Sequence, residues 1–115
     1  MLRGEIRLVN RDPAVGAEAN KRRPAVIVSN DRANATAARL GRGVITVVPV
    51  TSNVTMVYPF QVGLASGDSG LRVDSKAQTE QVRAVAVERV GPVLGRMPAT
   101  LMAALDDALR LHLHL

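Results

Sequence analysis

Short apolar runs separated by polar turns make up most of the chain, and they predict a sheet with few helices. Runs of alternating or β-branched residues predict strands at residues 3–9, 24–28, 43–50, 58–64 and 91–97, with two further short strands within residues 71–87. Helices are predicted at the Ala-rich segment 31–40, which Gly41 ends, and at 98–115, where Pro98 fits the first helical position. This order predicts an α+β fold on an antiparallel sheet.

A basic loop leads directly into the most apolar of these strands. Lys21, Arg22 and Arg23 precede Pro24, and the residue before a proline is forced into extended backbone. The run from Ala25 to Val28 then predicts a strand that is buried on both faces. Arg23 is therefore a guanidinium on a rigid element, which suits anion binding or catalysis. A solvated basic loop is the alternative interpretation.

The strand at 43–50 ends in three short polar side chains, Thr51, Ser52 and Asn53. Hydroxyl and amide groups at a strand terminus are typical of a functional site, but they are also typical of a turn that their own side chains stabilise. Pro49 predicts a sheet edge or a bulge near the end of this strand.

Composition bounds the class of protein. The 115 residues predict one domain, 1–115, and the absence of cysteine excludes disulfides and thiolate chemistry. No apolar run approaches the roughly 20 residues of a membrane helix, and the first residues lack the apolar core of a signal peptide. We therefore predict a cytoplasmic protein that does not bind a membrane.

Charge is distributed unevenly. Residues 1–50 hold nine Lys/Arg and four Asp/Glu, whereas residues 51–115 hold six of each, so the whole net charge of +5 lies in the first part. Such an excess predicts an anionic partner, nucleic acid first. Tyr58 and Phe60 are the only aromatic residues, so phosphate contacts would outweigh base stacking.

Several motifs occur together in one order along nearly the whole chain. They are Arg3-Gly4-Glu5-Ile6, then Gly16-Ala17-Glu18 with Arg23-Pro24, then Pro49-Val50-Thr51-Ser52 with Tyr58-Pro59-Phe60, and finally Gln81-x-Arg83 with Gly95-Arg96. With these motifs in this order, the chain resembles the MazF/PemK/Kid family, the endoribonuclease toxins of bacterial type II toxin–antitoxin systems. Arg7 departs from the pattern, because an aromatic residue is usual in the first strand.

The resemblance implies a small SH3-like, CcdB-like antiparallel β-barrel with a short helix after the second strand and a C-terminal helix. It also implies a homodimer that cleaves single-stranded RNA (mRNA, or rRNA or tRNA) through a 2′,3′-cyclic phosphate and so inhibits translation and growth. No metal or cofactor is expected. The implied protein partner is a MazE-like antitoxin with an acidic C-terminal segment, which would lie over the basic loop.

Catalytic roles follow from the resemblance and from acid–base chemistry. The catalytic Arg and Thr of the family carry over onto Arg23 and Thr51. A threonine hydroxyl is too weak a base alone, so Glu18 or Glu80 is the candidate general base; some members place an acid where Glu80 stands. The expected RNA contacts are phosphate binding by Lys21, Arg22 and Arg83, base recognition by Ser52, Asn53 and Gln81, and a further contact by Asn20.

Two other functions remain open on the same fold. One is a non-catalytic gyrase poison, which the Arg23–Thr51 pair argues against, and the other is an RNA-binding module that does not cut. His112 and His114 match no motif, and we expect them to be tail residues without a catalytic or metal-binding role.

Overall fold

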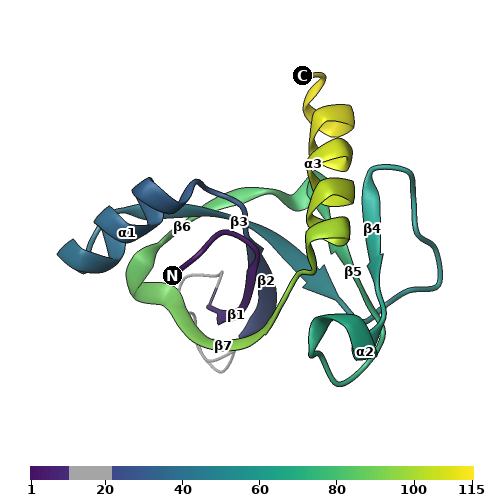
Figure 1. The fold of residues 1–115 in the computed structure, drawn as a ribbon, viewed down its shortest axis with the longest axis horizontal. Helices are drawn as coiled ribbons and strands as arrows, with labels where there is room; N and C mark the ends of the chain where they lie inside the picture. Colours follow the sequence, from purple (N-terminus) through teal and green to yellow (C-terminus); the bar gives the residue numbers. More distant parts are fainter. Residues whose placement is uncertain (11–21) are drawn as a thin grey trace, which may run out of the picture.

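The computed structural model describes residues 1–10 and 22–115 of the chain (Figure 1). In chain order its elements are β1 (Glu5–Val9), β2 (Arg23–Ile27), α1 (Asp31–Leu40), β3 (Val44–Thr51), β4 (Gln61–Leu64), α2 (Ser66–Ser69), β5 (Ser75–Gln78), the 3₁₀ turn η2 (Thr79–Gln81), β6 (Arg83–Ala86), the 3₁₀ turn η3 (Val87–Arg89), β7 (Val90–Arg96) and α3 (Ala99–Leu113).

The strands form one antiparallel sheet in the order β4-β5-β3-β2-β1-β7, with β6 paired to β3. The predicted class and both predicted helices are therefore confirmed. Within the described residues the sheet curls but follows an open path from β4 to β7, so it is less closed than the barrel that the resemblance implied. None of the described helices is long and apolar enough to span a membrane.

β3 lies in the middle of the sheet and not at its edge. One side of β3 pairs with β2, and the other side pairs first with β6, up to Val47, and then with β5, from Val50. Pro49, which has no backbone N–H to donate, falls in the gap between these two ladders. The proline thus marks the exchange of one neighbouring strand for another, and the edge that it seemed to predict is absent.

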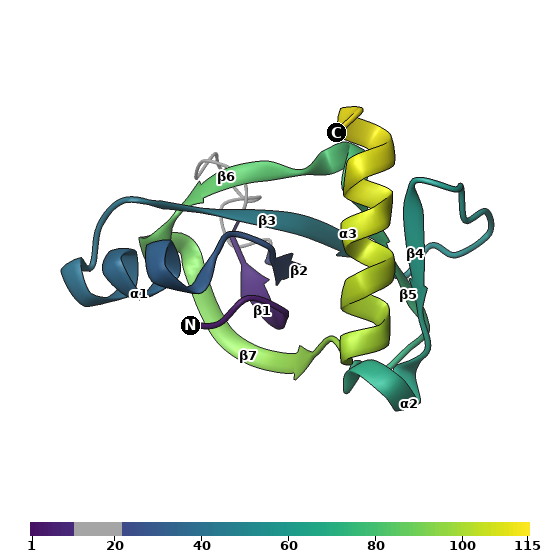
Figure 2. The same ribbon diagram turned by 45° about the horizontal axis from the view of Figure 1, so that its top comes forward.

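Alternation along β2 divides the core into two layers. Val26 belongs to a cluster that α3 covers, whereas Ala25 and Ile27 belong to a cluster on the opposite face that includes Ala37 of α1. Figure 2 shows α3 crossing in front of the sheet beside β4, with α1 at the far end of β3. All three β2 residues are fully buried, as their uninterrupted apolar run predicted.

Local signals explain the ends of the helices. Asn30 caps α1 by accepting the backbone N–H of Ala33 at 2.8 Å, and Gly41 ends it in the left-handed region at φ 65°. Pro98 precedes α3 as its N-cap, one position earlier than predicted. The segment 65–70 contains the single-turn helix α2, which the sequence analysis did not predict, and the strand predicted at 58–64 begins only at Gln61.

Candidate active site

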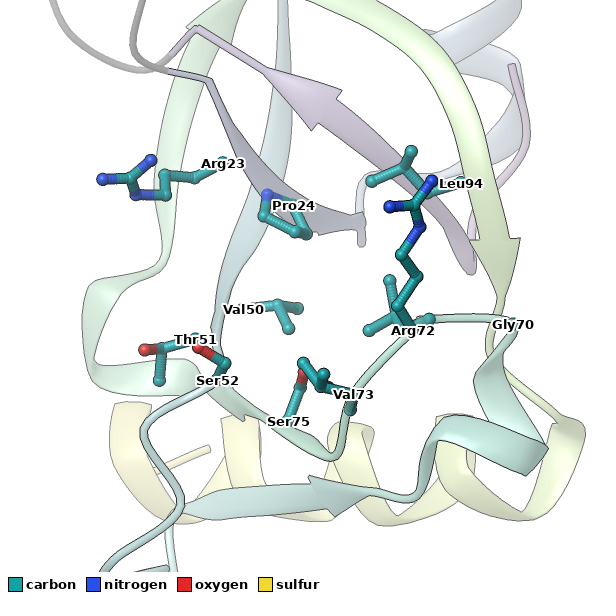
Figure 3. Close-up of a pocket in the computed structure, with 11 residues that line it drawn as sticks. Arg23, Pro24, Val50, Thr51, Ser52, Gly70, Arg72, Val73, Ser75 and Leu94 are labelled. Atoms are coloured by element: carbon teal, nitrogen blue, oxygen red, sulfur yellow. The ribbon is translucent and has the colours of Figure 1, made fainter.

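Strand register brings Arg23 and Thr51 together. The pairing of β2 with β3 ends at Ala25 and Pro49. Arg23 begins β2 and Thr51 ends β3, so the two residues lie at adjoining ends of these paired strands, and both line one pocket. Figure 3 shows both side chains extending to the same side, beyond the ends of their strands. The structure therefore brings the predicted catalytic Arg and Thr to the same pocket.

The Arg23 guanidinium is exposed and lightly held. Its Nη1 donates to the carbonyl oxygen of Arg22 at 3.2 Å, and it makes no ion pair with any described carboxylate. Its backbone is fixed by pairing with Val9 of β1. The charge is therefore mounted on a rigid strand, while the other N–H donors of the guanidinium remain available to an anion.

Thr51 opens the turn that leads away from β3. Its Oγ1 accepts the backbone N–H of Asn53 at 3.2 Å, and Asn53 Oδ1 in turn accepts the N–H of Thr55 at 3.3 Å. The predicted side-chain-stabilised turn is thus present. Because the Thr51 oxygen accepts within the turn, its own hydrogen remains to donate outward. Ser52, next along the chain, is exposed beside it.

The other predicted contacts are spread around this pair. Arg83 of β6 opposes Val47, so it lies on the Arg23–Thr51 face, four residues along β3, which is about 13 Å at ~3.3 Å per residue. Gln81 is exposed at the end of η2, just before β6. Arg22 lines a hollow of about 120 Å³ with Glu88 and Gly91. Glu18, Asn20 and Lys21 lie outside the described residues.

Polar side chains of β4, β5 and η2 hold the connection from Ser52 to Phe60. Lys76 is only 7% exposed; its Nζ donates to the carbonyl of Met56 and lies 5.8 Å from the centre of the Tyr58 ring. Gln61 accepts the N–H of Tyr58 at 3.1 Å, and Thr79 donates to the carbonyl of Phe60. We call Gln61, Lys76 and Thr79 the loop anchor. The sequence analysis missed it, because the residues are ordinary polar ones and the loop partners of Lys76 and Thr79 lie 20 and 19 positions away.

Glu80 contacts this anchor. Its Oε2 accepts from Nε2 of Gln61 at 2.7 Å, while its Oε1 is buried and has no hydrogen-bond partner among the described residues. The carboxylate is half-buried on η2, and Glu80 is not among the residues that line the pocket beside Arg23 and Thr51. Glu80 is therefore placed to orient Gln61.

A pocket of about 560 Å³ adjoins the Arg23–Thr51 pair (Figure 3). Its lining comes from β2, the end of β3, the segment 70–75 and β7, and comprises Arg23, Pro24, Val50, Thr51, Ser52, Gly70, Leu71, Arg72, Val73, Ser75 and Leu94. The sequence analysis did not single out Arg72, because its place at this pocket follows from the tertiary packing of segment 70–75.

Arg7 takes a structural place in β1. Its Nε donates to Glu5 Oε1 at 3.1 Å and its Nη1 to the carbonyl of Gly91 at 3.0 Å. Burial alone would raise the pKa of Glu5, but hydrogen bonds from Leu2 and Arg7 and the charge of Arg7 outweigh it and hold that pKa below its ordinary value. Arg7 therefore ties β1 to β7.

Comparison with known proteins identifies the family of the chain. Residues 2–113 match the model of the PemK-like, MazF-like toxins of type II toxin–antitoxin systems. The chain is 64% identical over 115 residues to endoribonuclease MazF9 of Mycobacterium tuberculosis, covering 100% of this chain and 98% of that protein. It is 72% identical over 57 residues to the probable endoribonuclease MazF1 of the same organism, covering 50% of this chain and 61% of that protein.

Solved structures show the same fold. The crystal structure of MazF from Deinococcus radiodurans superposes with a TM-score of 0.75 at 25% identity, covering 100% of this chain and 97% of that one. An endoribonuclease in complex with its cognate antitoxin from Mycobacterial species superposes with a TM-score of 0.78 at 21% identity, over 100% and 96% of the two chains. The chain belongs to the PemK/MazF family of type II toxin–antitoxin toxins.

Proposed function

We propose that this chain is an endoribonuclease toxin that cleaves single-stranded RNA at the Arg23–Thr51 pair without a metal ion. The observation that carries the proposal is the pairing of β2 with β3, which brings a guanidinium without an ion pair among the described residues and a hydroxyl to the same pocket. The 64% identity to endoribonuclease MazF9 supports RNA cleavage over a gyrase poison or a non-catalytic RNA-binding module.

RNA supplies its own nucleophile. The 2′-oxygen attacks the adjacent phosphorus, the bond from phosphorus to the 5′-oxygen breaks, and a 2′,3′-cyclic phosphate and a 5′-hydroxyl result. The 2′-OH proton passes to a base, and the departing 5′-oxygen takes up a proton. The protein has to position the phosphate and stabilise the extra negative charge of the phosphorane.

Arg23 suits the charge-stabilising role. Its planar fork offers two parallel donors to the phosphorane oxygens, and no described carboxylate competes for them. A guanidinium is a poor acid at its ordinary pKa, so we assign it charge stabilisation ahead of proton donation. Thr51 donates a further hydrogen bond to the phosphate, because its oxygen already accepts from Asn53.

The remaining predicted residues take supporting roles. Glu18 is the proposed general base, because the Glu80 carboxylate is engaged by Gln61 and we assign it a positioning role. Lys21, Arg22 and Arg83 contact flanking phosphates. Base contacts are assigned to Ser52, Asn53 and Gln81, with Asn20 as a further RNA contact.

We further propose a homodimer that acts on RNA in the cytoplasm and is inhibited by a MazE-like antitoxin. A solved relative is a MazE–MazF structure from Deinococcus radiodurans, which covers 100% of this chain at 24% identity with a TM-score of 0.74. The excess positive charge of residues 1–50 suits an acidic antitoxin segment that competes with RNA. A stoichiometric antitoxin should therefore suppress cleavage.

The test is incubation of the pure protein with a mixed-sequence RNA in EDTA, followed by analysis of the ends. We expect 2′,3′-cyclic phosphate and 5′-hydroxyl termini, and no cleavage of an otherwise identical RNA that carries 2′-O-methyl groups. Binding without cleavage in both RNAs would identify a non-catalytic module. Cleavage that EDTA abolishes would point to a metal-dependent reaction.

A further inference from the structure

The pocket beside Arg23 and Thr51 combines an apolar floor with a positive rim. Pro24, Val50, Val73 and Leu94 supply apolar surface, and Figure 3 shows them surrounding the hollow between the two strands and segment 70–75. No Asp or Glu is among the lining residues that the structure describes. An uncharged, largely apolar face attached to a phosphate, as in a nucleotide, therefore fits this surface, whereas a free cation does not.

The wall formed by segment 70–75 is held in place before any ligand arrives. Gly70 ends α2 at φ +84°, and the chain there lies so close to β7 that a Cβ on Gly95 would be 2.0 Å from the carbonyl oxygen of Ser69. Ser75 donates to the carbonyl of Val73 at 3.1 Å. A preformed pocket loses little entropy when it binds a ligand.

Arg72 is the polar group on this wall. It is exposed, and none of the described carboxylates forms an ion pair with it. Figure 3 shows its side chain rising along the pocket toward Leu94, on the side opposite Arg23 and Thr51. A ligand held at both rims would therefore place its phosphate at Arg23 and a second acceptor group at Arg72.

We propose that this pocket binds the base of a nucleotide next to the scissile phosphate, and that Arg72 selects guanine there by donating to its O6 and N7. Guanine presents the pair of acceptors that a guanidinium fork matches, and an arginine pairs with them more often than with any other base edge. The proposal rests on RNA being the substrate at Arg23–Thr51, and it makes Arg72 a specificity-determining residue of that reaction.

Cleavage tests the specificity directly. The wild type, Arg72→Ala and Arg39→Ala are each tested for cleavage of two sets of four short RNAs. The RNAs of one set differ only at the nucleotide on one side of the scissile phosphate, and those of the other set differ only at the nucleotide on the other side. Arg39 is an exposed arginine in the last turn of α1, away from the pocket, and serves as the matched control. We expect wild type and Arg39→Ala to prefer guanine on one side, and Arg72→Ala to lose that preference by roughly five- to hundredfold.

Other outcomes would overturn the proposal. An equal loss for all four bases would make Arg72 a general phosphate contact. An unchanged base preference, together with weaker binding of an acidic antitoxin peptide, would assign the pocket to that peptide. Val73→Trp should also abolish the guanine preference, because the larger side chain fills the pocket. Val73 is 55% exposed, so the substitution does not disturb the packing of the hydrophobic core.

Binding to non-cleavable RNA separates this proposal from the proposed function. The same eight sequences with 2′-O-methyl groups are titrated against the three proteins at one salt concentration. Guanine-selective binding that Arg72→Ala removes would support the pocket even if the wild type cut no RNA at all. Binding without base preference, beside normal cleavage, would overturn the pocket and leave the endoribonuclease intact.

Discussion

At the scale of single residues, the site depends on what each charged group already contacts. Arg23 is exposed and, among the described residues, donates only to the neighbouring carbonyl of Arg22, whereas Glu80 is engaged by Gln61. Sequence reasoning could select Arg23 and Thr51, because a pre-proline arginine and a strand-terminal threonine are local features. It could not separate the roles of the carboxylates, since the Gln61–Glu80 contact joins residues 19 positions apart.

Arg23→Lys should give a folded protein that binds RNA and cleaves it very slowly. Lysine keeps the charge but not the planar fork, and loss of one transition-state donor typically costs about 2.7–4 kcal/mol, on the order of 10²–10³ in rate. Since Arg23 is exposed, the free energy of unfolding should change by less than about 1 kcal/mol. Single-turnover cleavage beside a binding isotherm at the same salt measures both effects, with Arg39→Lys as the control. Near-wild-type cleavage by Arg23→Lys would reduce Arg23 to a general electrostatic contact.

Glu80→Gln should lower cleavage by less than about tenfold and leave the shape of the pH–rate profile unchanged, because a positioning residue does not itself transfer the proton. The glutamine retains an oxygen that accepts from Gln61. Glu80→Ala removes that acceptor and should be the more damaging change. The rates are measured in single turnover from pH 5 to 9. Loss of the acidic limb of the profile in Glu80→Gln, with a rate loss above a hundredfold, would instead identify Glu80 as the general base.

At the scale of elements, the site is built from strands that the sequence predicts well and from two connections, 52–60 and 70–75, whose positions it does not predict. β-branched runs place the strands, since such side chains suit a pleated, buried surface. The single-turn α2 escaped prediction, because a Gly/Ser/Asp segment of four residues has no measurable period. The loop anchor and the contact of segment 70–75 with β7 escaped because they arise only when β4, β5 and β7 are brought together.

Lys76→Met should loosen the connection 52–60 and impair cleavage without unfolding the protein. Methionine fills the buried space, and replacing a buried charge by an apolar side chain is often nearly neutral for stability, so we expect a change within about 1 kcal/mol. The carbonyl of Met56 loses its donor, so amide hydrogen exchange at residues 54–58 should accelerate. KM should rise more than kcat falls, because Ser52 and Asn53 are less well positioned. Unchanged exchange and unchanged kinetics would show that Lys76 does not hold the loop.

Gly95→Ala should destabilise the fold by at least about 2 kcal/mol. The added Cβ would lie 2.0 Å from the backbone oxygen of Ser69, and backbone cannot move aside as a flexible side chain does. Gly67→Ala is the matched control: the space around its Cβ is open, and alanine favours helix, so it should be neutral or slightly stabilising. Urea unfolding of the two variants measures the difference. Equal midpoints would mean that segment 70–75 is free to move away from β7.

At the scale of the whole molecule, the N-terminal strand and the C-terminal helix are tied together. The Nη2 of Arg3 lies 2.5 Å from Asp106 of α3, and its Nε donates to the carbonyl of Val28 at 2.7 Å. The Arg110–Asp107 pair lies within α3 at helical spacing, whereas the tie from Arg3 to Asp106 depends on the path of the chain.

The uneven charge of the chain predicts how RNA binding responds to salt. Four contacts proposed for phosphate, at Lys21, Arg22, Arg23 and Arg83, give a slope of log K against log[salt] of about −2.8, at ~0.7 per contact for single strands. Affinity for a non-cleavable RNA should therefore fall roughly fiftyfold between 50 and 200 mM salt.

Arg83→Ala should make the slope of log K against log[salt] shallower by about 0.7, because a specific contact releases its own counterion. Arg39→Ala removes the same charge from α1 and should leave the slope unchanged. The slopes come from binding isotherms of one 2′-O-methyl RNA at four salt concentrations. If both substitutions reduced the slope equally, RNA would respond to the overall charge of the molecule and not to a track of arginines along the Arg23–Thr51 face.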